Sequence, residues 1–182
     1  EETQGMEIGD MFVSFSGGKD STVVADLCKR ALDGPGKKIL HIFGDTTLEF
    51  PMTEQYVAQY KKENPKTPMI SSRNKEKNFE ELCEIVGPPS RVMRWCCTIF
   101  KTGAINQKIS ALFRGKKRIV AFQGICHSES ASRSKYERTS TNSKIAKQLT
   151  LCPIIEWFDF DVWLYLMTTG IAFNSAYRLG YA

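Results

Sequence analysis

The sequence has no apolar run approaching the ~20 residues that cross a bilayer, so we expect no membrane association. Its first residues, Glu1 to Gln4, carry neither the basic nor the apolar segment of a secretory signal. Internal repeats, Gly/Ser-rich linkers and low-complexity segments are also missing. These absences, with a length of 182 residues, predict a single globular domain, residues 1–182, in the cytoplasm.

The sequence also lacks any pair of cysteines with Cys-x-x-Cys spacing. The six cysteines do not indicate a disulfide framework in a chain of this length, and reduced thiols or metal ligands fit better. The charge is mildly basic, with 25 Lys and Arg against 20 Asp and Glu. This balance suits a polyanionic ligand such as a nucleotide or a nucleic acid, and a solvated lysine-rich surface is the simpler alternative.

Short apolar segments alternate along the chain with segments of helical periodicity. Residues 126–150 are polar and lack a period, which predicts a long functional loop. Strands are predicted at 11–15, 39–43, 66–71, 118–124 and 151–155, and helices at 22–32, 52–62, 79–86, 102–113 and 160–167. This alternation predicts an α/β fold in three layers, whose twisted, mostly parallel sheet has helices on both faces.

The hexad Ser16-Gly17-Gly18-Lys19-Asp20-Ser21 lies between the first predicted strand and the first predicted helix. Its adjacent glycines permit a tight turn and a close approach of the backbone to a ligand. The amides at the helix start and the serine hydroxyls favour phosphate oxygens. The hexad is not a Walker A loop, because Asp20 follows the lysine, and its glycine spacing is not that of the dinucleotide fingerprint.

This hexad closely resembles the PP-loop of the adenine-nucleotide alpha-hydrolase superfamily. Within that superfamily, collinear segments from about residue 11 to residue 181 resemble the phosphoadenosine-phosphosulfate (PAPS) reductase family. The segments are Asp45-Thr46-Thr47, Arg94-Trp95-Cys96-Cys97-Thr98 with Lys101, Gly124 through Glu129-Ser130 to Arg133, and a C-terminal part from Pro153 through Trp157 and Asn174 to Tyr177 and Tyr181. The resemblance implies a Rossmann-like nucleotide-binding fold and a substrate that is ATP, PAPS or adenosine phosphosulfate (APS).

The resemblance also implies roles for particular residues. Lys101 and Arg133, with Arg73 as a further candidate, would neutralise phosphate or sulfate. Asp20 would cap the helix or orient a phosphate bound to a metal such as Mg²⁺, and Glu129 would pair with Arg133 or bind ribose or metal. The expected catalytic residues are Asp20, Lys101 and Arg133, and the expected nucleotide-binding residues are Ser14, Ser16, Gly17, Gly18, Lys19, Asp20, Ser21, Gly44, Asp45, Thr46, Gly124 and Glu129.

Cys96 and Cys97 are adjacent, and a disulfide between neighbours closes a strained eight-membered ring. In iron–sulfur members of the family such a pair joins a downstream Cys-x-x-Cys pair to hold a [4Fe–4S] cluster, which takes four thiolates. Cys126 and Cys152 do not replace that second pair. We therefore expect the cluster only in a longer protein that continues beyond Ala182. Two structural thiols are the alternative, and a zinc site is a weaker one.

Three functions remain open at this point. The first is an enzyme of sulfur metabolism that reduces an adenylyl sulfate with a thioredoxin-like protein as partner. The second is an ATP pyrophosphatase that takes sulfur from a donor protein and modifies a nucleic acid, by DNA phosphorothioation or tRNA thiolation. The third belongs to another class and is a non-catalytic nucleotide-binding module of a larger complex.

Overall fold

The computed structural model describes residues 6–76, 78–141 and 147–181, so residues 142–146 of the predicted loop lie outside the described part. The first five residues, residue 77 and Ala182 lie outside it as well. The described strands are β1 (Met11–Phe15), β2 (Leu40–Asp45), β3 (Met69–Arg73), β4 (Ile119–Gln123), β5 (Thr139–Thr141) and β6 (Gln148–Leu151). The described α-helices are α1 (Lys19–Leu32), α2 (Pro51–Glu63), α3 (Phe79–Val86), α4 (Ala104–Leu112) and α5 (Asp159–Thr169).

The strands form one sheet in the order β3-β2-β1-β4-β6-β5. All neighbours are parallel except β5 and β6, which confirms the predicted α/β class. The chain runs outward from β1 to β3 and then crosses back to place β4 on the other side of β1. In sheets of this kind ligands bind at the carboxyl ends of the strands where the strand order reverses, here between β1 and β4.

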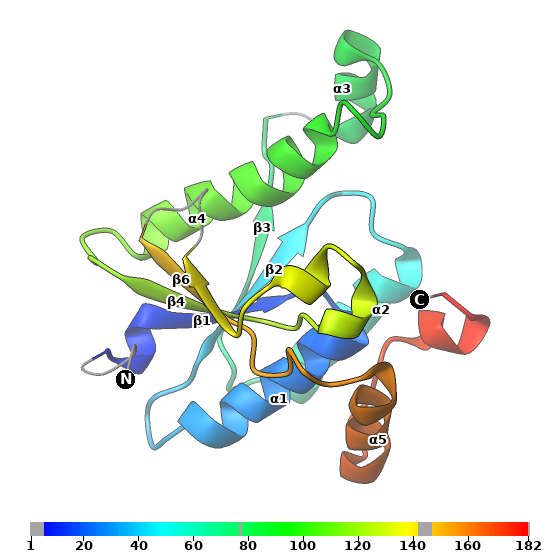
Figure 1. The fold of residues 1–182 in the computed structure, drawn as a ribbon. Coiled ribbons are helices and arrows are strands. Elements are labelled where there is room, and N and C mark those ends of the chain that lie inside the picture. Colours follow the sequence, from blue (N-terminus) through cyan, green and yellow to red (C-terminus); the bar gives the residue numbers. More distant parts are fainter. Residues whose placement is uncertain (1–5, 77, 142–146, 182) are drawn as a thin grey trace.

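Helices cover both faces of the sheet, with α1, α2 and α5 on one side and α4 on the other, while α3 projects beyond the segment that leads into α4 (Figure 1). Alternate side chains of a strand point to opposite faces, so β1 supplies two cores. Val13 and Phe15 pack in the cluster that includes α1 and α5, whereas Phe12 packs with Ile109 of α4. Among the described residues, no helix combines the length and the apolar content that a bilayer crossing requires.

The structure corrects several predicted boundaries. The third strand covers Met69–Arg73 rather than 66–71, and α4 begins at Ala104 after a π-helical segment, η2 (Cys97–Gly103). The prediction of a strand at 151–155 is wrong: β6 ends at Leu151, and the chain then makes turns in which Ile155 N donates to Cys152 O at 3.3 Å. Proline has no N–H to give to a sheet, and Pro153 stands at this point.

The predicted long loop at 126–150 contains more structure than its composition indicates. Two short 3₁₀ helices, η3 (His127–Glu129) and η4 (Arg133–Lys135), precede β5, which pairs with β6. Their hydrogen bonds are partly with distant residues, such as the bond of 2.8 Å from His127 N to Ile155 O. Sequence periodicity does not reveal bonds of this kind.

His41 is a fully buried titratable group in β2, beside the stacked rings of Phe15 and Tyr60. Its Nδ1 lies 3.2 Å from the carbonyl oxygen of Ile39. Burial lowers the pKa of His41 to about 4, because the charged imidazolium loses its hydration, while the bond to Ile39 opposes the shift.

This shift predicts a loss of stability in mild acid. The unfolded chain binds the His41 proton near pH 6.5 and the folded chain only near pH 4. The contribution of neutral His41 to the free energy of unfolding is therefore fully present above pH 6.5. It falls by about 3 kcal/mol as the pH drops to 4. Urea unfolding measured from pH 7.5 to 4.5 would test this. In the His41→Gln variant the decline over that range should shrink, and an unchanged decline would assign it to other groups.

Candidate active site

Glycine is required at position 17 by the turn from β1 into α1. Gly17 has φ of 75°, and a Cβ placed there would lie 3.1 Å from Val57 Cγ2 and 3.2 Å from Thr53 Cγ2. Both the left-handed backbone and the crowding against α2 exclude a larger residue. Gly18 follows as the N-cap of α1, so the first amides of the helix lie directly behind the turn.

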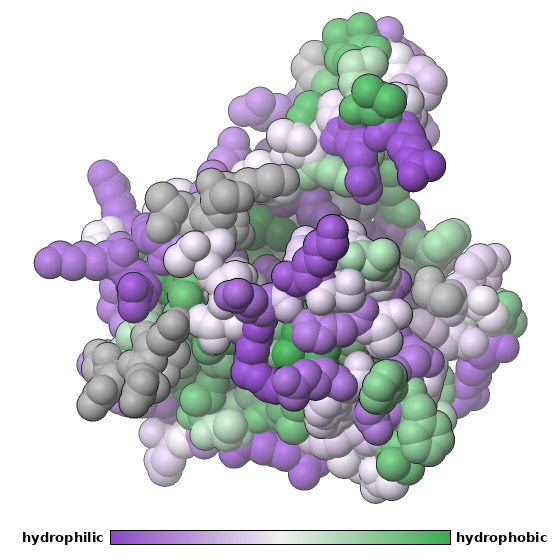
Figure 2. Space-filling model, in the orientation of Figure 1, coloured by the Kyte–Doolittle hydropathy of each residue, from purple (hydrophilic) through white to green (hydrophobic). Residues whose placement is uncertain are grey.

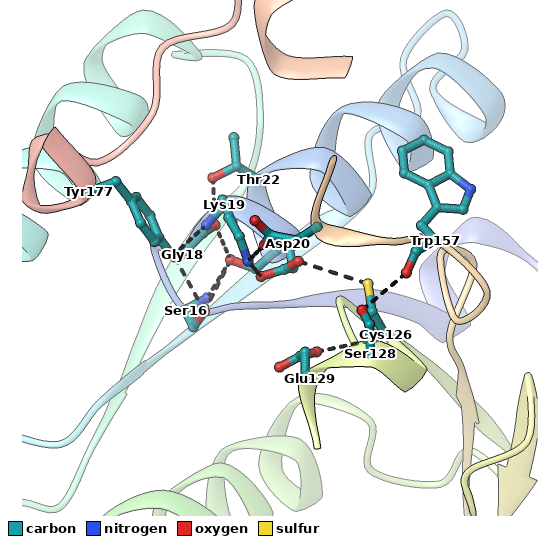
Figure 3. A network of polar contacts seen from close by, with 12 residues as sticks. Ser16, Gly18, Lys19, Asp20, Thr22, Cys126, Ser128, Glu129, Trp157 and Tyr177 are labelled. Carbon is teal, nitrogen blue, oxygen red and sulfur yellow. Dashed lines mark hydrogen bonds and ion pairs between the residues drawn. The ribbon is translucent and has the colours of Figure 1, made fainter. Parts of the chain in front are cut away.

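Serine hydroxyls hold the turn closed. Ser21 Oγ accepts from Ser16 N at 3.2 Å and donates to Gly18 O at 2.9 Å, and the hydroxyls of Ser16 and Ser21 are 3.1 Å apart. Ser21 is buried, whereas Ser16 is exposed. The network therefore fixes the position of the Ser16 hydroxyl at the surface, close to the start of α1 (Figure 3).

Two residues near the other end of the chain complete the turn. Tyr177 Oη accepts from the amide of Lys19 at 3.0 Å. Asn174 is buried, and its Nδ2 donates to Thr53 Oγ1 at 2.9 Å and lies 3.4 Å from Gly17 O. The sequence analysis gave these residues no role in the hexad, although both lie in the C-terminal segment that carries the family resemblance.

Lys19 and Asp20 form an ion-pair cluster and line neither of the two cavities described below. Lys19 Nζ lies 3.0 Å from Asp20 Oδ2 and 2.9 Å from Asp159 Oδ1, which joins the starts of α1 and α5. Burial lowers the pKa of Lys19, but the two carboxylates outweigh it, so the net shift is upward and the charge is retained. Asp20 Oδ1 is 3.9 Å from Cys126 Sγ. The expected contacts of Lys19 and Asp20 with phosphate remain predictions.

A cavity of about 290 Å³ lies at the carboxyl ends of β1 and β4. Serine hydroxyls line it together with the cations Lys101 of η2 and Arg133 of η4. Figure 2 shows the surface hollowed between the α4 layer and the neighbouring segments. The predicted site residues that the structure brings together here are Ser14, Ser16, Ser21, Lys101, Gly124 and Arg133. Such a mixture of hydroxyls and cations favours an anionic ligand.

Arg133 is held in place by Glu129, since their side chains form an ion pair one helical turn apart. The other carboxylate oxygen of Glu129 accepts from Cys126 N at 2.8 Å. This pairing is one of the roles expected for Glu129. The carboxylate thereby orients the guanidinium at the cavity wall.

Gly124 lies where β4 meets the first turn of α1. A Cβ at this position would be 2.5 Å from the carbonyl carbon of Asp20 and 2.7 Å from Ser21 N. Both neighbours are backbone atoms, which cannot move aside as a flexible side chain can. Only glycine allows β4 and the hexad to approach closely enough to form the cavity wall.

A second cavity of about 170 Å³ adjoins the hexad. Ser16, Gly17 and Gly18 line it together with Glu49 and Tyr177. Ser16 lines both cavities, so the turn of the hexad separates them. The sequence analysis did not predict this second cavity, because its walls come from three distant parts of the chain.

The residues predicted at the end of β2 lie apart from both cavities. Asp45 Oδ1 accepts from Thr47 N at 2.9 Å, and Asp45 Oδ2 lies 3.9 Å from Arg73 Nη1. Thr46 Oγ1 donates to Glu49 at 2.8 Å. A Cβ on Gly44 would lie 3.4 Å from Ile105, whose side chain lines the larger cavity. A role for Gly44, Asp45 and Thr46 in nucleotide binding remains a prediction.

The two adjacent cysteines, Cys96 and Cys97, are half-buried at the start of η2. Within the part of the chain that the structure describes, no group of three or more His, Cys, Asp or Glu residues is placed to hold one metal ion. A [4Fe–4S] cluster needs four thiolates, and these residues supply two. The described residues therefore do not fit a complete cluster site, and we derive no reaction step through one.

Comparison with known proteins places this arrangement in context. A model of the phosphoadenosine phosphosulfate reductase domain matches residues 10–182. An uncharacterised protein of Methanocaldococcus jannaschii is 33% identical over 94% of this chain, and the chain covers 34% of that protein. An adenosine 5'-phosphosulfate reductase of Anoxybacillus flavithermus is 27% identical, with 94% of this chain and 69% of the reductase covered.

The fold is similar to that of a solved structure, the phosphoadenylyl-sulfate reductase of Candida auris in complex with phosphate. The TM-score is 0.70 at 16% identity, with 95% of this chain and 79% of the reductase covered. At this identity the similarity concerns the fold alone. The chain spans about a third of the length of the M. jannaschii protein.

Proposed function

The chain belongs to the phosphoadenosine phosphosulfate reductase domain family, and on this premise we propose that it is an enzyme that binds an adenylyl nucleotide in the larger cavity. The observation that carries the proposal is that Ser16, Lys101 and Arg133 line one cavity at the switch point of the sheet. The phosphate groups bind at the hexad, where the amides of α1 and the Ser16 hydroxyl supply donors. Lys101 and Arg133 offset the negative charge of the phosphate or sulfate.

The first candidate reaction is reduction of an adenylyl sulfate. A thiolate attacks the sulfur, the bond between sulfur and the bridging oxygen breaks, and the adenosine phosphate leaves with the electron pair. A second thiol then displaces sulfite from the S-sulfonated cysteine and leaves a disulfide. Lys101 and Arg133 would stabilise the negative charge that develops on the leaving phosphate.

The attacking thiolate must be reactive at neutral pH, and the thiol closest to the hexad does not meet this condition. Burial raises the pKa of Cys126 to about 12, and Asp20 beside it adds to the shift. Burial also raises the pKa of Cys152. Because thiols are weak nucleophiles, these two buried cysteines do not fit the attacking role, and we propose that a thioredoxin-like dithiol protein supplies the reducing thiols.

The second candidate is an ATP pyrophosphatase. The protonated state of Cys126 favours it, because its first step needs no thiolate. In this reaction an acceptor oxygen or nitrogen attacks the α-phosphate of ATP, forms an adenylate and displaces pyrophosphate. The same hydroxyls and cations serve the reaction, and no thiolate of the described residues takes part in this step. A sulfur-donor protein and a nucleic acid are the partners that this candidate requires.

The released product distinguishes the two reactions. We expect the protein to bind AMP under either reaction. The reductase reaction would release sulfite from APS or PAPS in the presence of a dithiol, whereas the pyrophosphatase reaction would release pyrophosphate from ATP. Ser16→Ala should weaken AMP binding about tenfold, since it removes one hydrogen bond to a charged group. Isothermal titration would measure the affinity, with Ser110→Ala on the exposed side of α4 as the matched control. Equal affinity in Ser16→Ala and the wild type would contradict the placement of the phosphates.

A further inference from the structure

Gln148 is a buried polar side chain that lines the larger cavity and has no role in the proposed chemistry. It is the first residue of β6, and only 3% of its surface is exposed. Its Nε2 donates to Thr150 Oγ1 at 3.3 Å. Among residues 6–76, 78–141 and 147–181, no donor reaches its Oε1. A buried acceptor without a partner is unfavourable, so a donor from a ligand is expected at this atom.

The position of Gln148 places its amide at the inner part of the cavity. Gln148 and Thr150 share one face of β6, and their hydrogen bond shows that the amide extends along the strand toward its carboxyl end. Thr150 is level with Ala121 of β4, which is level with Phe12 of β1. Because β4 lies between β6 and β1, the amide of Gln148 is about two strand spacings, ~10 Å, from β1 at the level of Phe12.

The lining of the cavity is of two kinds. The Ser16 hydroxyl and the two cations suit the phosphates, whereas Phe12 and Ile105 supply apolar walls. A planar heteroaromatic base fits between apolar walls, and its polar edge needs partners of matching geometry. A carboxamide offers one acceptor and one donor side by side, which matches the edge of adenine.

We propose that Gln148 is the residue that selects adenine as the base of the nucleotide. Its Oε1 accepts from the 6-amino group, and its Nε2 donates to N7 of the ring. Hypoxanthine has acceptors at both N7 and the 6-oxygen, so Oε1 would face an acceptor in either orientation of the amide and the base would be rejected. This inference rests on the proposed function, because it assumes that a nucleotide occupies the cavity.

The test compares the binding of AMP and IMP to the 182-residue chain by titration calorimetry. We expect the wild type to bind AMP at least tenfold more tightly than IMP. Gln148→Leu keeps the size of the side chain but removes both polar groups. It should bind AMP about tenfold more weakly, and its preference for AMP over IMP should fall to nearly one.

Pyrophosphate is the control ligand, since it occupies only the phosphate end. Its affinity should be the same in the wild type and in Gln148→Leu, which also shows that the variant is folded. Gln148→Ala is a second variant, which tests whether leucine itself distorts the cavity. It should lose the preference for AMP over IMP in the same way. A wild type that binds AMP and IMP equally, or variants that weaken both equally, would overturn the inference and leave nucleotide binding intact. A wild type that binds neither nucleotide would refute the proposed function itself.

Discussion

Replacing Gly124 with alanine is expected to abolish measurable AMP binding and to lower the free energy of unfolding by about 1–3 kcal/mol. The added methyl group would stand 2.5 Å from the carbonyl carbon of Asp20 and 2.7 Å from Ser21 N. Relief of that overlap requires β4 to separate from the first turn of α1. Such a movement displaces the hexad and the cavity wall together, so a single methyl group affects stability and binding at once.

Gly34 provides the matched control for this experiment. A Cβ at position 34 would meet no atom within 4 Å, and the residue lies in the turn after α1, away from both cavities. Gly34→Ala should leave AMP affinity unchanged and alter the urea midpoint little. A Gly124→Ala protein with the stability and AMP affinity of the wild type would show that β4 and α1 are not packed as described.

Removal of either cavity cation is expected to lower turnover by a factor of about 10²–10³, whichever of the two reactions operates. Lys101→Ala and Arg133→Ala each delete a positive charge from the part of the cavity where negative charge develops. Both positions retain solvent contact, Lys101 being exposed and the Arg133 side chain 41% exposed. The substitutions should therefore leave the fold intact, and the loss should appear in kcat/KM for sulfite or pyrophosphate release.

The conservative variants separate charge from geometry. Lys101→Arg and Arg133→Lys keep the charge and should recover part of the activity, although lysine lacks the planar, forked set of donors that arginine has. Lys117→Ala removes an exposed cation outside both cavities and serves as the control. Turnover that depends on Lys117 as strongly as on Lys101 would indicate a general effect of net charge instead of a local one.

The part of the site that follows from local sequence was predictable. The run Met11–Phe15 is apolar and β-prone, the hexad supplies the turn, and helical periodicity follows, so strand, loop and helix could be read in order. The placement of Lys101 and Arg133 at the cavity came from the family resemblance. Local periodicity could not have given it, because the two side chains come from segments about thirty residues apart.

The orientation of individual side chains was not predictable in the same way. Lys19 directly follows the two glycines and was expected to bind phosphate, and the sequence does not reveal its ion pair with Asp159 of α5. The length of β6 depends on pairing with β4 and β5, which outweighs the apolar character of Ile154 and Ile155. Gln148 is a polar residue in a polar stretch, and only the folded sheet shows that it is buried.

The contacts of Asn174 and Tyr177 with the hexad have a consequence for the order in which the protein acquires its binding function. Each contact joins residues more than 150 positions apart, at Gly17 and Lys19. A ribosome delivers Asn174 and Tyr177 long after the hexad, so the nascent chain holds an incomplete turn until these two residues emerge. If the hexad binds the nucleotide as proposed, binding begins only after the segment with Asn174 and Tyr177 has docked, and a bound ligand then marks the folding of this domain.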